Sequence, residues 1–283
     1  VTGFSVGDFI KISCNTGNSV STSDFRGMLN EITSIDSGSK IFYLRYPVSF
    51  PIDHTKTNSV TRTTIGTGRL RVANPQFEMA GASGAVSGLY VTNFIDPVVT
   101  GGRVSGLSGA GLIVQNSIGG VVDDYSGTGN VTSGSNSDYS LIWCTKTRVS
   151  DINSHLSGSF GQTYSAIAWI DYSSVVTTNS VGRAIKLEYS CGNIGRGVVA
   201  LNCGGTGVSV AQGSSYNILS DVVAIGNAGE GVWFNGGGNT FNKVIGVEAY
   251  ANTNYDVTST NSGGLTDTSN AFLDVNSTAV TSV

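Results

Sequence analysis

We expect an all-β chain built as a right-handed, single-stranded parallel β-helix, with a small β-rich segment at its N-terminus. The 283 residues include 39 glycines but only 4 prolines, and only 12% of them are charged. No window shows sustained helical spacing of apolar residues, whereas short alternating runs rich in Val, Ile, Thr and Tyr recur along the chain. Similar segments also return about every 25 residues, which indicates a solenoid.

The first 75 residues differ from the rest because their predicted strands are longer. The runs FSVGDFIKIS, MLNEITSID and KIFYLRYPV each fit a strand, and the turn Asp36-Ser37-Gly38-Ser39 joins the last two. We therefore predict an entry segment over 1–75, a β-helix over 76–262 and a C-terminal cap or tail over 263–283. A solenoid needs its ends covered, so the two flanking segments are the expected caps.

The clearest repeat pairs SYNILSDVVAIGN (215–227) with TFNKVIGVEAYAN (240–252). Asn217 and Asn242 are 25 residues apart, and so are Asn227 and Asn252. Corners of a β-helix need tightly turned or left-handed backbone, which favours Gly and Asn, so we interpret these asparagines as stacked corners and not as ligands. A β-sandwich is the alternative fold, but it does not explain this register. The strand that opens each coil is predicted in GLYVTN (from 88), GLIVQN (111), LIWCTK (141), AWIDYS (168), IKLEYS (185), GVSVAQGS (207) and GVWFNGGG (231).

Composition excludes several classes of function. A net charge of −4 argues against a nucleic-acid partner, because neutralising phosphates requires a basic face. No apolar stretch approaches the ~18 residues of a membrane span, so membrane insertion is not expected. The four cysteines form no CxxC pair and are expected to be buried apolar residues, with a Cys191–Cys203 disulfide as the alternative. Two histidines without near partners argue against a zinc site, and we expect no metal and no cofactor.

Alternation along the predicted strands decides which side chains point outward. All three tryptophans fall in one outward column, beside carboxylates and amides, which is the surface that stacks pyranose rings and binds their hydroxyls. Alternatively, a loop, the entry segment or a neighbouring subunit covers the tryptophans. The predicted columns are Tyr90, Ile113, Trp143, Trp169, Lys186, Ser209 and Trp233, and beside them Thr92, Gln115, Thr145, Asp171, Glu188, Ala211 and Asn235. The predicted substrate-binding residues are Trp143, Trp169, Arg183, Lys186, Trp233 and Asn235.

Asp171 and Glu188 are the predicted catalytic residues. Equivalent positions on successive coils would place their backbones about 5 Å apart. Repulsion between the two carboxyls would then raise the pKa of one, leaving an acid beside a base or nucleophile, as glycoside hydrolysis requires. The alternative is a structural stack neutralised by Lys186 or Arg183. Glu230, just before Trp233, is a weaker candidate.

The coils over 88–255 resemble the pectate-lyase-like right-handed parallel β-helices of bacteriophage tailspikes and related tail appendage proteins. The resemblance rests on the Gly-apolar-x-apolar coils and on an entry segment, FSVGDFIKIS followed by EITSIDSGSKIFYLRYPV, that is similar to the lead-ins of such spikes. It implies a homotrimer at the virion tail, outside the cell, that binds a bacterial surface polysaccharide and cleaves it as an endo-glycosidase.

Two other functions stay open. One is a non-catalytic glycan-binding or structural spike segment, and the other is a bacterial polysaccharide lyase or epimerase. The opening residues Val1 to Phe4 show neither the basic nor the apolar region of a signal peptide, so we expect such a peptide to be absent or removed. A fragment of a longer spike is one interpretation of this chain.

Overall fold

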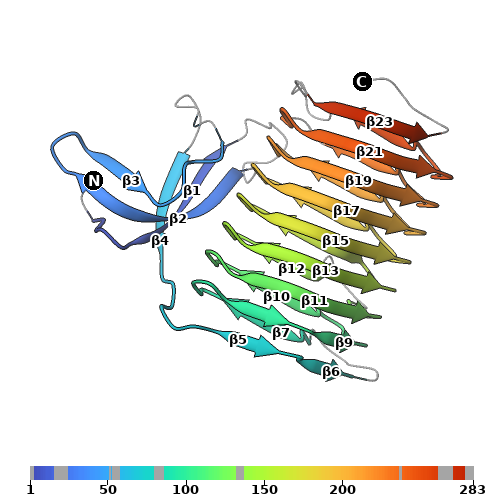
Figure 1. Cartoon of the computed structure of the whole chain (residues 1–283), viewed down its shortest axis with the longest axis horizontal. Coiled ribbons are helices and arrows are strands. Elements are labelled where there is room, and N and C mark those ends of the chain that lie inside the picture. Colours follow the sequence, from blue (N-terminus) through green and yellow to red (C-terminus); the bar gives the residue numbers. More distant parts are fainter. Residues whose placement is uncertain are drawn as a thin grey trace.

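The computed structural model of the chain describes residues 3–15, 25–50, 52, 58–79, 86–131, 137–235, 238–260 and 270–277. These residues form 23 β-strands arranged as a parallel solenoid with a small antiparallel sheet beside it (Figure 1). The described residues form no helix, and therefore no helix that is long and apolar enough to cross a membrane. The predicted all-β solenoid with a β-rich N-terminal segment is confirmed.

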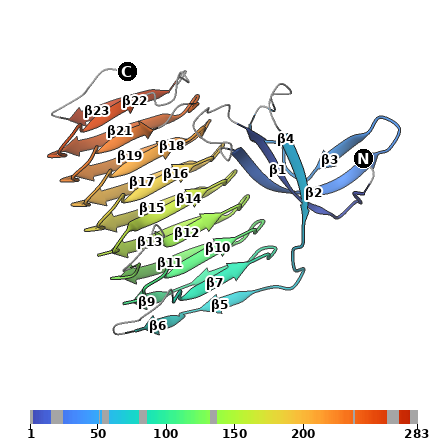
Figure 2. The same ribbon diagram turned by 180° about the vertical axis from the view of Figure 1, so that it is seen from behind.

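The N-terminal sheet has the strand order β3-β2-β1-β4 and is antiparallel throughout. It lies against the side of the solenoid, near the middle coils, and not across the lower end (Figures 1 and 2). Its apolar residues Ile10, Ile12 and Met28 pack in one cluster with Ala168 and Cys191 of the solenoid. The strands are β1 (Phe9–Asn15), β2 (Phe25–Asp36), β3 (Ile41–Leu44) and β4 (Asn58–Thr63).

One side of the solenoid is a parallel sheet of eight strands, most of them four residues long, which we call the short-strand sheet. Its strands alternate between buried and more exposed residues, as in β10 and β20, because one face lines the core and the other faces outward. The strands are β7 (Leu89–Thr92), β10 (Leu112–Gln115), β12 (Ser137–Ile142), β14 (Phe160–Ser165), β16 (Ile185–Glu188), β18 (Val208–Ala211), β20 (Val232–Asn235) and β22 (Val257–Thr260).

A second parallel sheet of eleven strands, the long-strand sheet, forms the opposite side. Parallel pairing runs through it from Arg71 in β5 to Ser277 in β23, while the division of the chain at 75 and 262 stays a prediction. The strands are β5 (Arg71–Ala73), β6 (Gln76–Glu78), β8 (Val98–Thr100), β9 (Arg103–Ser105), β11 (Val121–Thr128), β13 (Arg148–His155), β15 (Asp171–Thr178), β17 (Ile194–Leu201), β19 (Ile218–Ile225), β21 (Lys243–Tyr250) and β23 (Ala271–Ser277).

A single residue per coil pairs between the two sheets and closes the third side of the solenoid. The residues of this bridge column are Ile95, Ile118, Thr145, Ala168, Cys191, Ser215 and Thr240. The turn on each side of the bridge column contains a residue with left-handed backbone, for example Asn116 and Gly119 in one coil. Gly and Asn adopt this conformation at the lowest cost, which explains their abundance at the corners.

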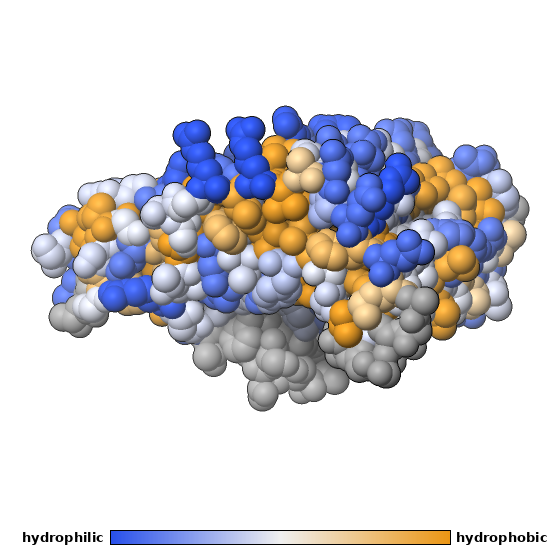
Figure 3. Space-filling model, turned by 90° about the horizontal axis from the view of Figure 1, so that it is seen from below, coloured by the Kyte–Doolittle hydropathy of each residue, from blue (hydrophilic) through white to orange (hydrophobic). Residues whose placement is uncertain are grey.

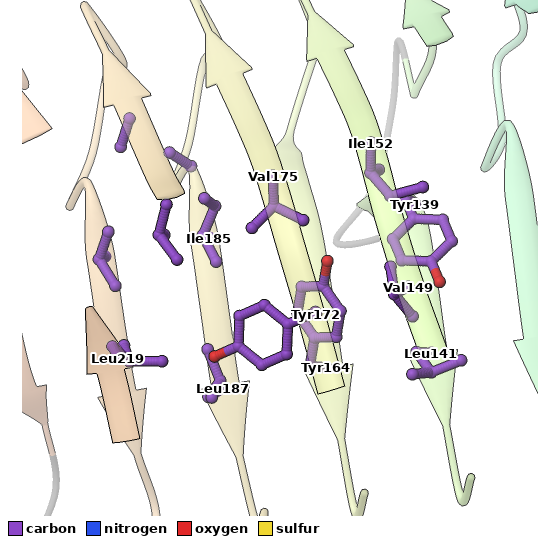
Figure 4. Packing of buried hydrophobic residues seen from close by; sticks show 14 of the residues in the cluster. Tyr139, Leu141, Val149, Ile152, Tyr164, Tyr172, Val175, Ile185, Leu187 and Leu219 are labelled. Carbon is purple, nitrogen blue, oxygen red and sulfur yellow. The ribbon is translucent and has the colours of Figure 1, made fainter. Parts of the chain in front are cut away.

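The space between the sheets is filled by stacked apolar side chains. Val, Leu and Ile from successive coils lie above one another, and Figure 4 shows Leu141, Leu187 and Leu219 inside the solenoid. Tyr164 and Tyr172 stack with ring centroids 5.2 Å apart. Burying each large apolar side chain contributes roughly 1.5–3 kcal/mol, so this core is the main source of stability.

Buried asparagines join the coils at the corner before the long-strand sheet. The Nδ2 of Asn193 donates to Asn217 Oδ1 at 2.7 Å, Asn217 Nδ2 donates to Asn242 Oδ1 at 2.9 Å, and Asn242 Nδ2 donates to Asn270 Oδ1 at 3.0 Å. The interpretation of the repeating asparagines as stacked corners is confirmed. All four cysteines are buried and none forms a disulfide, as expected.

A buried carboxyl group lies inside the middle coils. Asp138 accepts hydrogen bonds from the Tyr125 hydroxyl at 2.9 Å, Asn130 Nδ2 at 2.7 Å and the Ser154 hydroxyl at 2.7 Å. Burial raises the pKa of Asp138 from 3.8 to about 6, although these three hydrogen bonds act in the opposite direction. The folded protein therefore holds a proton on Asp138 at pH values where the unfolded chain has released it.

This difference in pKa predicts that Asp138 makes folding less favourable as the pH rises. Because the folded pKa lies above the unfolded one, its contribution to stability is complete below pH 3.8 and is lost as the pH rises through about 6. The loss amounts to about 3 kcal/mol. Urea unfolding of the protein and of Asp138→Asn, measured from pH 3.5 to 7.5, isolates this contribution as the difference between the two curves. A difference that does not change with pH would contradict the prediction.

Candidate functional site

The outer face of the short-strand sheet carries two columns of side chains, one residue of each per strand. Tyr90, Ile113, Lys186, Ser209 and Trp233 occupy the first column, as predicted. Two coils differ from the prediction, because Ser140 and Thr163 hold the positions assigned to Trp143 and Trp169. The second column consists of Thr92, Gln115, Ile142, Ser165, Glu188, Ala211 and Asn235.

Trp143 and Trp169 lie in the turns beside the bridge column and not on the outer face of the short-strand sheet. Trp143 packs against Gly27 of β2, with Lys11 Nζ 5.2 Å from the centre of its ring. The indole nitrogen of Trp169 donates to the carbonyl of Pro47 at 3.1 Å. The prediction of one column with all three tryptophans is wrong, and the N-terminal sheet covers part of both rings.

Asp171 and Glu188 belong to different sheets, so the predicted stack of these two carboxylates is wrong. Asp171 begins β15 in the long-strand sheet and pairs in register with Ile194. Glu188 ends β16 in the short-strand sheet. Each carboxylate has a cationic partner: Arg196 lies 2.9 Å from Asp171, and Lys186 forms an ion pair with Glu188. The role of the two residues in catalysis stays a prediction.

The ion pair of Lys186 and Glu188 borders a hollow of about 170 Å³ on the outer face of the short-strand sheet. Both side chains are only about 15% exposed, so water screens this pair less than a surface pair. The hollow is also lined by Ser140, Thr163 and Phe160. It combines an apolar wall, hydroxyls and a charged pair in one concave place, which suits a polar ligand with apolar faces.

Trp233 lies on the same face, near the upper end of the first column. The guanidinium carbon of Arg183 is 5.7 Å from the centre of the Trp233 ring, a cation–π arrangement. Ser209 lies between Lys186 and Trp233 in the column, and its buried hydroxyl has no hydrogen-bond partner. Asn235 follows Trp233 in β20 as the second-column residue. The fold thus brings five of the eight predicted site residues to one face: Arg183, Lys186, Glu188, Trp233 and Asn235.

The outer face of the short-strand sheet does not bring two carboxylates together in the columns described above. Glu188 is the one acidic residue in the two outward columns of the short-strand sheet. Glu230 lies two coils higher, in the turn before β20, where its carboxylate accepts hydrogen bonds from Thr206 Oγ1 at 2.8 Å and Asn254 Nδ2 at 3.2 Å. Glycoside hydrolysis needs two carboxylates about 5 to 9.5 Å apart, and the two columns supply one. In the described part of the chain, no three His, Cys, Asp or Glu side chains are grouped to hold a metal ion.

Sequence reasoning missed the polar residues of the two middle coils. Ser137 and Thr163 share a hydrogen bond of 2.5 Å across β12 and β14, and both line the hollow. The hydroxyl of Tyr90 donates to Gln115 one coil above. The available signal was the alternation in SDYSLI and FGQTYS, whose inward residues include Tyr139, Gln162 and Tyr164 instead of aliphatic side chains.

The fold and this face define a class: parallel β-solenoids with an elongated polar and aromatic outer face. The chain is similar in structure to the tailspike protein gp49 from Pseudomonas phage LKA1, with 12% identity, a TM-score of 0.53, and coverage of 92% of this chain and 41% of that one. It thus spans about two fifths of that tailspike, and the likeness shows a shared fold.

A further similar structure is the periplasmic alginate epimerase AlgG, with 12% identity, a TM-score of 0.47, and coverage of 65% of this chain and 51% of that one. Another is PfbA, a surface adhesin of Streptococcus pneumoniae, with 10% identity, a TM-score of 0.34, and coverage of 66% of this chain and 62% of that one. No protein-family model matches the sequence, and no curated protein matches it.

Proposed function

We propose that this chain is part of a phage tail spike and binds a bacterial surface polysaccharide along the outer face of the short-strand sheet. The observation that carries the proposal is the outward column from Tyr90 to Trp233, in which polar, aromatic and ion-paired side chains lie in register on either side of the buried Ser140 and Ser209. A glycan repeats along its length as the coils do, so several weak contacts can act on one chain together. The solenoid fold shared with a phage tailspike supports this proposal.

The proposal includes a homotrimer at the virion tail, outside the host cell, as the resemblance implies. Cleavage of the glycan is a further part of it, with Glu188 and Asp171 as the residues to test. Within one chain these carboxylates lie on different sheets, so binding without cleavage, as in an adhesin, is the simpler activity for this geometry.

Trp233→Ala is expected to weaken polysaccharide binding about tenfold, which corresponds to about 1.4 kcal/mol, because it removes the aromatic platform and the stacking partner of Arg183. The measurement uses labelled capsular, O-antigen and wall polysaccharides from a panel of bacteria. Tyr250→Ala is the matched control, since Tyr250 is an exposed aromatic residue at the end of β21 on the other sheet. Equal binding by Trp233→Ala and the unchanged protein would contradict the proposed face.

The same incubations test for cleavage by size-exclusion of the glycan. Unchanged polymer with retained binding supports a binding spike. Shortened oligosaccharides that disappear with Glu188→Gln or Asp171→Asn, while binding is retained, would instead establish a depolymerase. Failure of the protein to bind any polysaccharide of the panel would overturn the proposed function.

A further inference from the structure

Bulky aromatic residues occupy left-handed positions in the turn between the bridge column and the long-strand sheet. Trp169, Tyr216 and Phe241 have φ values of 56°, 58° and 57°. The equivalent residues of the other coils are also left-handed, but none of them is aromatic: they are Asp96, Gly119, Lys146 and Gly192. An aromatic side chain is strained in this conformation, whereas Gly or Asn is not, so stability alone does not explain these residues.

Two of these aromatic rings are open to solvent. Tyr216 is 44% exposed and Phe241 is 46% exposed. Their rings stack face to face, with centroids 5.1 Å apart and an angle of 8° between the planes. Stacking fixes the orientation of Tyr216 before any ligand arrives, which reduces the entropy lost on binding.

Tyr216 and Trp169 border a pocket of about 580 Å³ between the solenoid and residues 48–50, which follow β3 of the N-terminal sheet. The pocket exists because Gly192, which lies between these two rings in the column, has no side chain. A Cβ atom at Gly192 would approach the Trp169 ring to 3.2 Å. Apolar walls come from Phe50, Ile194 and Ile218.

Polar groups lie at two edges of this junction pocket. Ser49 lines it, and the buried hydroxyl of Ser49 has no hydrogen-bond partner. On the strand next to Ile194, Asp171 faces outward and forms its ion pair with Arg196. The pocket therefore offers two aromatic faces, an apolar interior and a polar edge, and none of the described residues that line it is charged.

We propose that the junction pocket binds one sugar residue that carries a methyl group, such as a 6-deoxyhexose or an N-acetylated hexosamine. The volume is that of a small-molecule site. The eight described residues that line it are far fewer than the roughly 20–30 residues that each side of a stable protein interface contributes. Pyranose C–H faces pack on Tyr216 and Trp169, and the methyl group is buried among Phe50, Ile194 and Ile218. A uronic acid is disfavoured because the described residues that line the pocket include no cation, and Lys243, next to Ile218 on β21, lies outside this lining. The inference extends the proposed function, because it adds a second glycan contact on another side of the solenoid.

The test uses the full chain with methyl α-L-rhamnoside and methyl N-acetyl-β-D-glucosaminide, with methyl β-D-glucuronide as the comparison sugar. Saturation-transfer NMR is expected to show binding of at least one of the methyl-bearing probes, strongest at the methyl protons, and none of the glucuronide. Tyr216→Asn should weaken that binding at least tenfold while keeping or raising the melting temperature, because Asn is favoured at a positive φ. Leu156→Asn is the matched control: Leu156 is also exposed and left-handed, with a φ of 53°, but lies beyond the far end of β13.

The proposal is overturned if neither methyl-bearing probe binds at 20 mM, or if Tyr216→Asn and Leu156→Asn bind the probe equally well. Preferred binding of the glucuronide would also overturn it. The proposed function and the pocket are tested separately. If Trp233→Ala loses polymer binding and Tyr216→Asn does not, the outer face is supported and the pocket is rejected as a glycan contact. The converse result would support the pocket alone.

Discussion

Asp138→Ala is expected to lower the free energy of unfolding by about 4 kcal/mol at pH 5, the largest effect of any single side chain outside the apolar core. The substitution removes the acceptor shared by Tyr125, Asn130 and Ser154 and leaves a void between coils. Each buried donor without a partner costs about 1–3 kcal/mol. Equilibrium unfolding in urea, followed by far-ultraviolet circular dichroism, measures the change.

The loss should be about 1 kcal/mol smaller at pH 7 than at pH 5, because pH 7 lies above the folded pKa of about 6 and most of the native carboxyl is ionised there, at a cost that alanine avoids. Asp138→Asn is the matched control. Its Oδ1 can accept from Tyr125 and Asn130, while the Ser154 hydroxyl can turn towards the carbonyl of Gly161, now 3.5 Å away. An alanine variant within 1 kcal/mol of the unchanged protein at pH 5 would show that the three donors find other acceptors.

The fold was predictable because a solenoid repeats its physical requirements in every coil. Stacked interior positions require apolar residues at fixed intervals, and the corners require Gly or Asn, so both appear in the sequence at nearly constant spacing. The outward residues were placed correctly in the five coils whose strands have apolar inward residues, such as LIVQ and VWFN. In these coils the alternation of apolar and polar residues and the spacing of the repeats both predict the same outward residues.

The prediction failed in the two coils between residues 137 and 170 for a physical reason. The turn residues Cys144 and Ile167 are buried in the same interior cluster as the strand residues, and Ala168 is buried where the N-terminal sheet packs on the solenoid. Hydrophobicity therefore marked LIWCTK and AWIDYS as strands, although much of each is turn. The true strands contain buried Tyr139, Gln162 and Tyr164, whose polar atoms concealed their inward direction. Because of this error in register, Asp171 was predicted to lie in the same sheet as Glu188, whereas it lies in the long-strand sheet.

The position of the N-terminal sheet could not be derived from the sequence either. The sequence FSVGDFIKIS predicts a strand with an apolar face, but it does not indicate which surface of the solenoid that face covers. The structure places it on the bridge column, where Ile10, Ile12 and Met28 pack against the solenoid. That contact covers part of Trp143 and Trp169, and it creates the junction pocket. The pocket depends on contacts between residues about 120 positions apart, such as Pro47 and Trp169.

Asn217→Ala is expected to destabilise the protein by about 3 kcal/mol, because Asn217 is a central member of the asparagine ladder. Its Oδ1 accepts from Asn193, and its Nδ2 donates to Asn242 and to the carbonyl of Ser190. Alanine leaves these buried groups with fewer partners in two adjacent coils at once. Guanidinium unfolding, monitored by circular dichroism, gives the free-energy change.

Asn153→Ala is the matched control, since Asn153 is exposed on β13 and should change stability by less than about 0.5 kcal/mol. Because each coil contacts only its neighbours, a weakened interface near Asn217 should also separate unfolding of the upper coils from that of the lower coils. The unfolding curve of Asn217→Ala is then expected to broaden, with a smaller m-value than that of the unchanged protein. A single sharp transition with unchanged m-value and midpoint would show that the apolar stack, and not the asparagine ladder, holds these coils together.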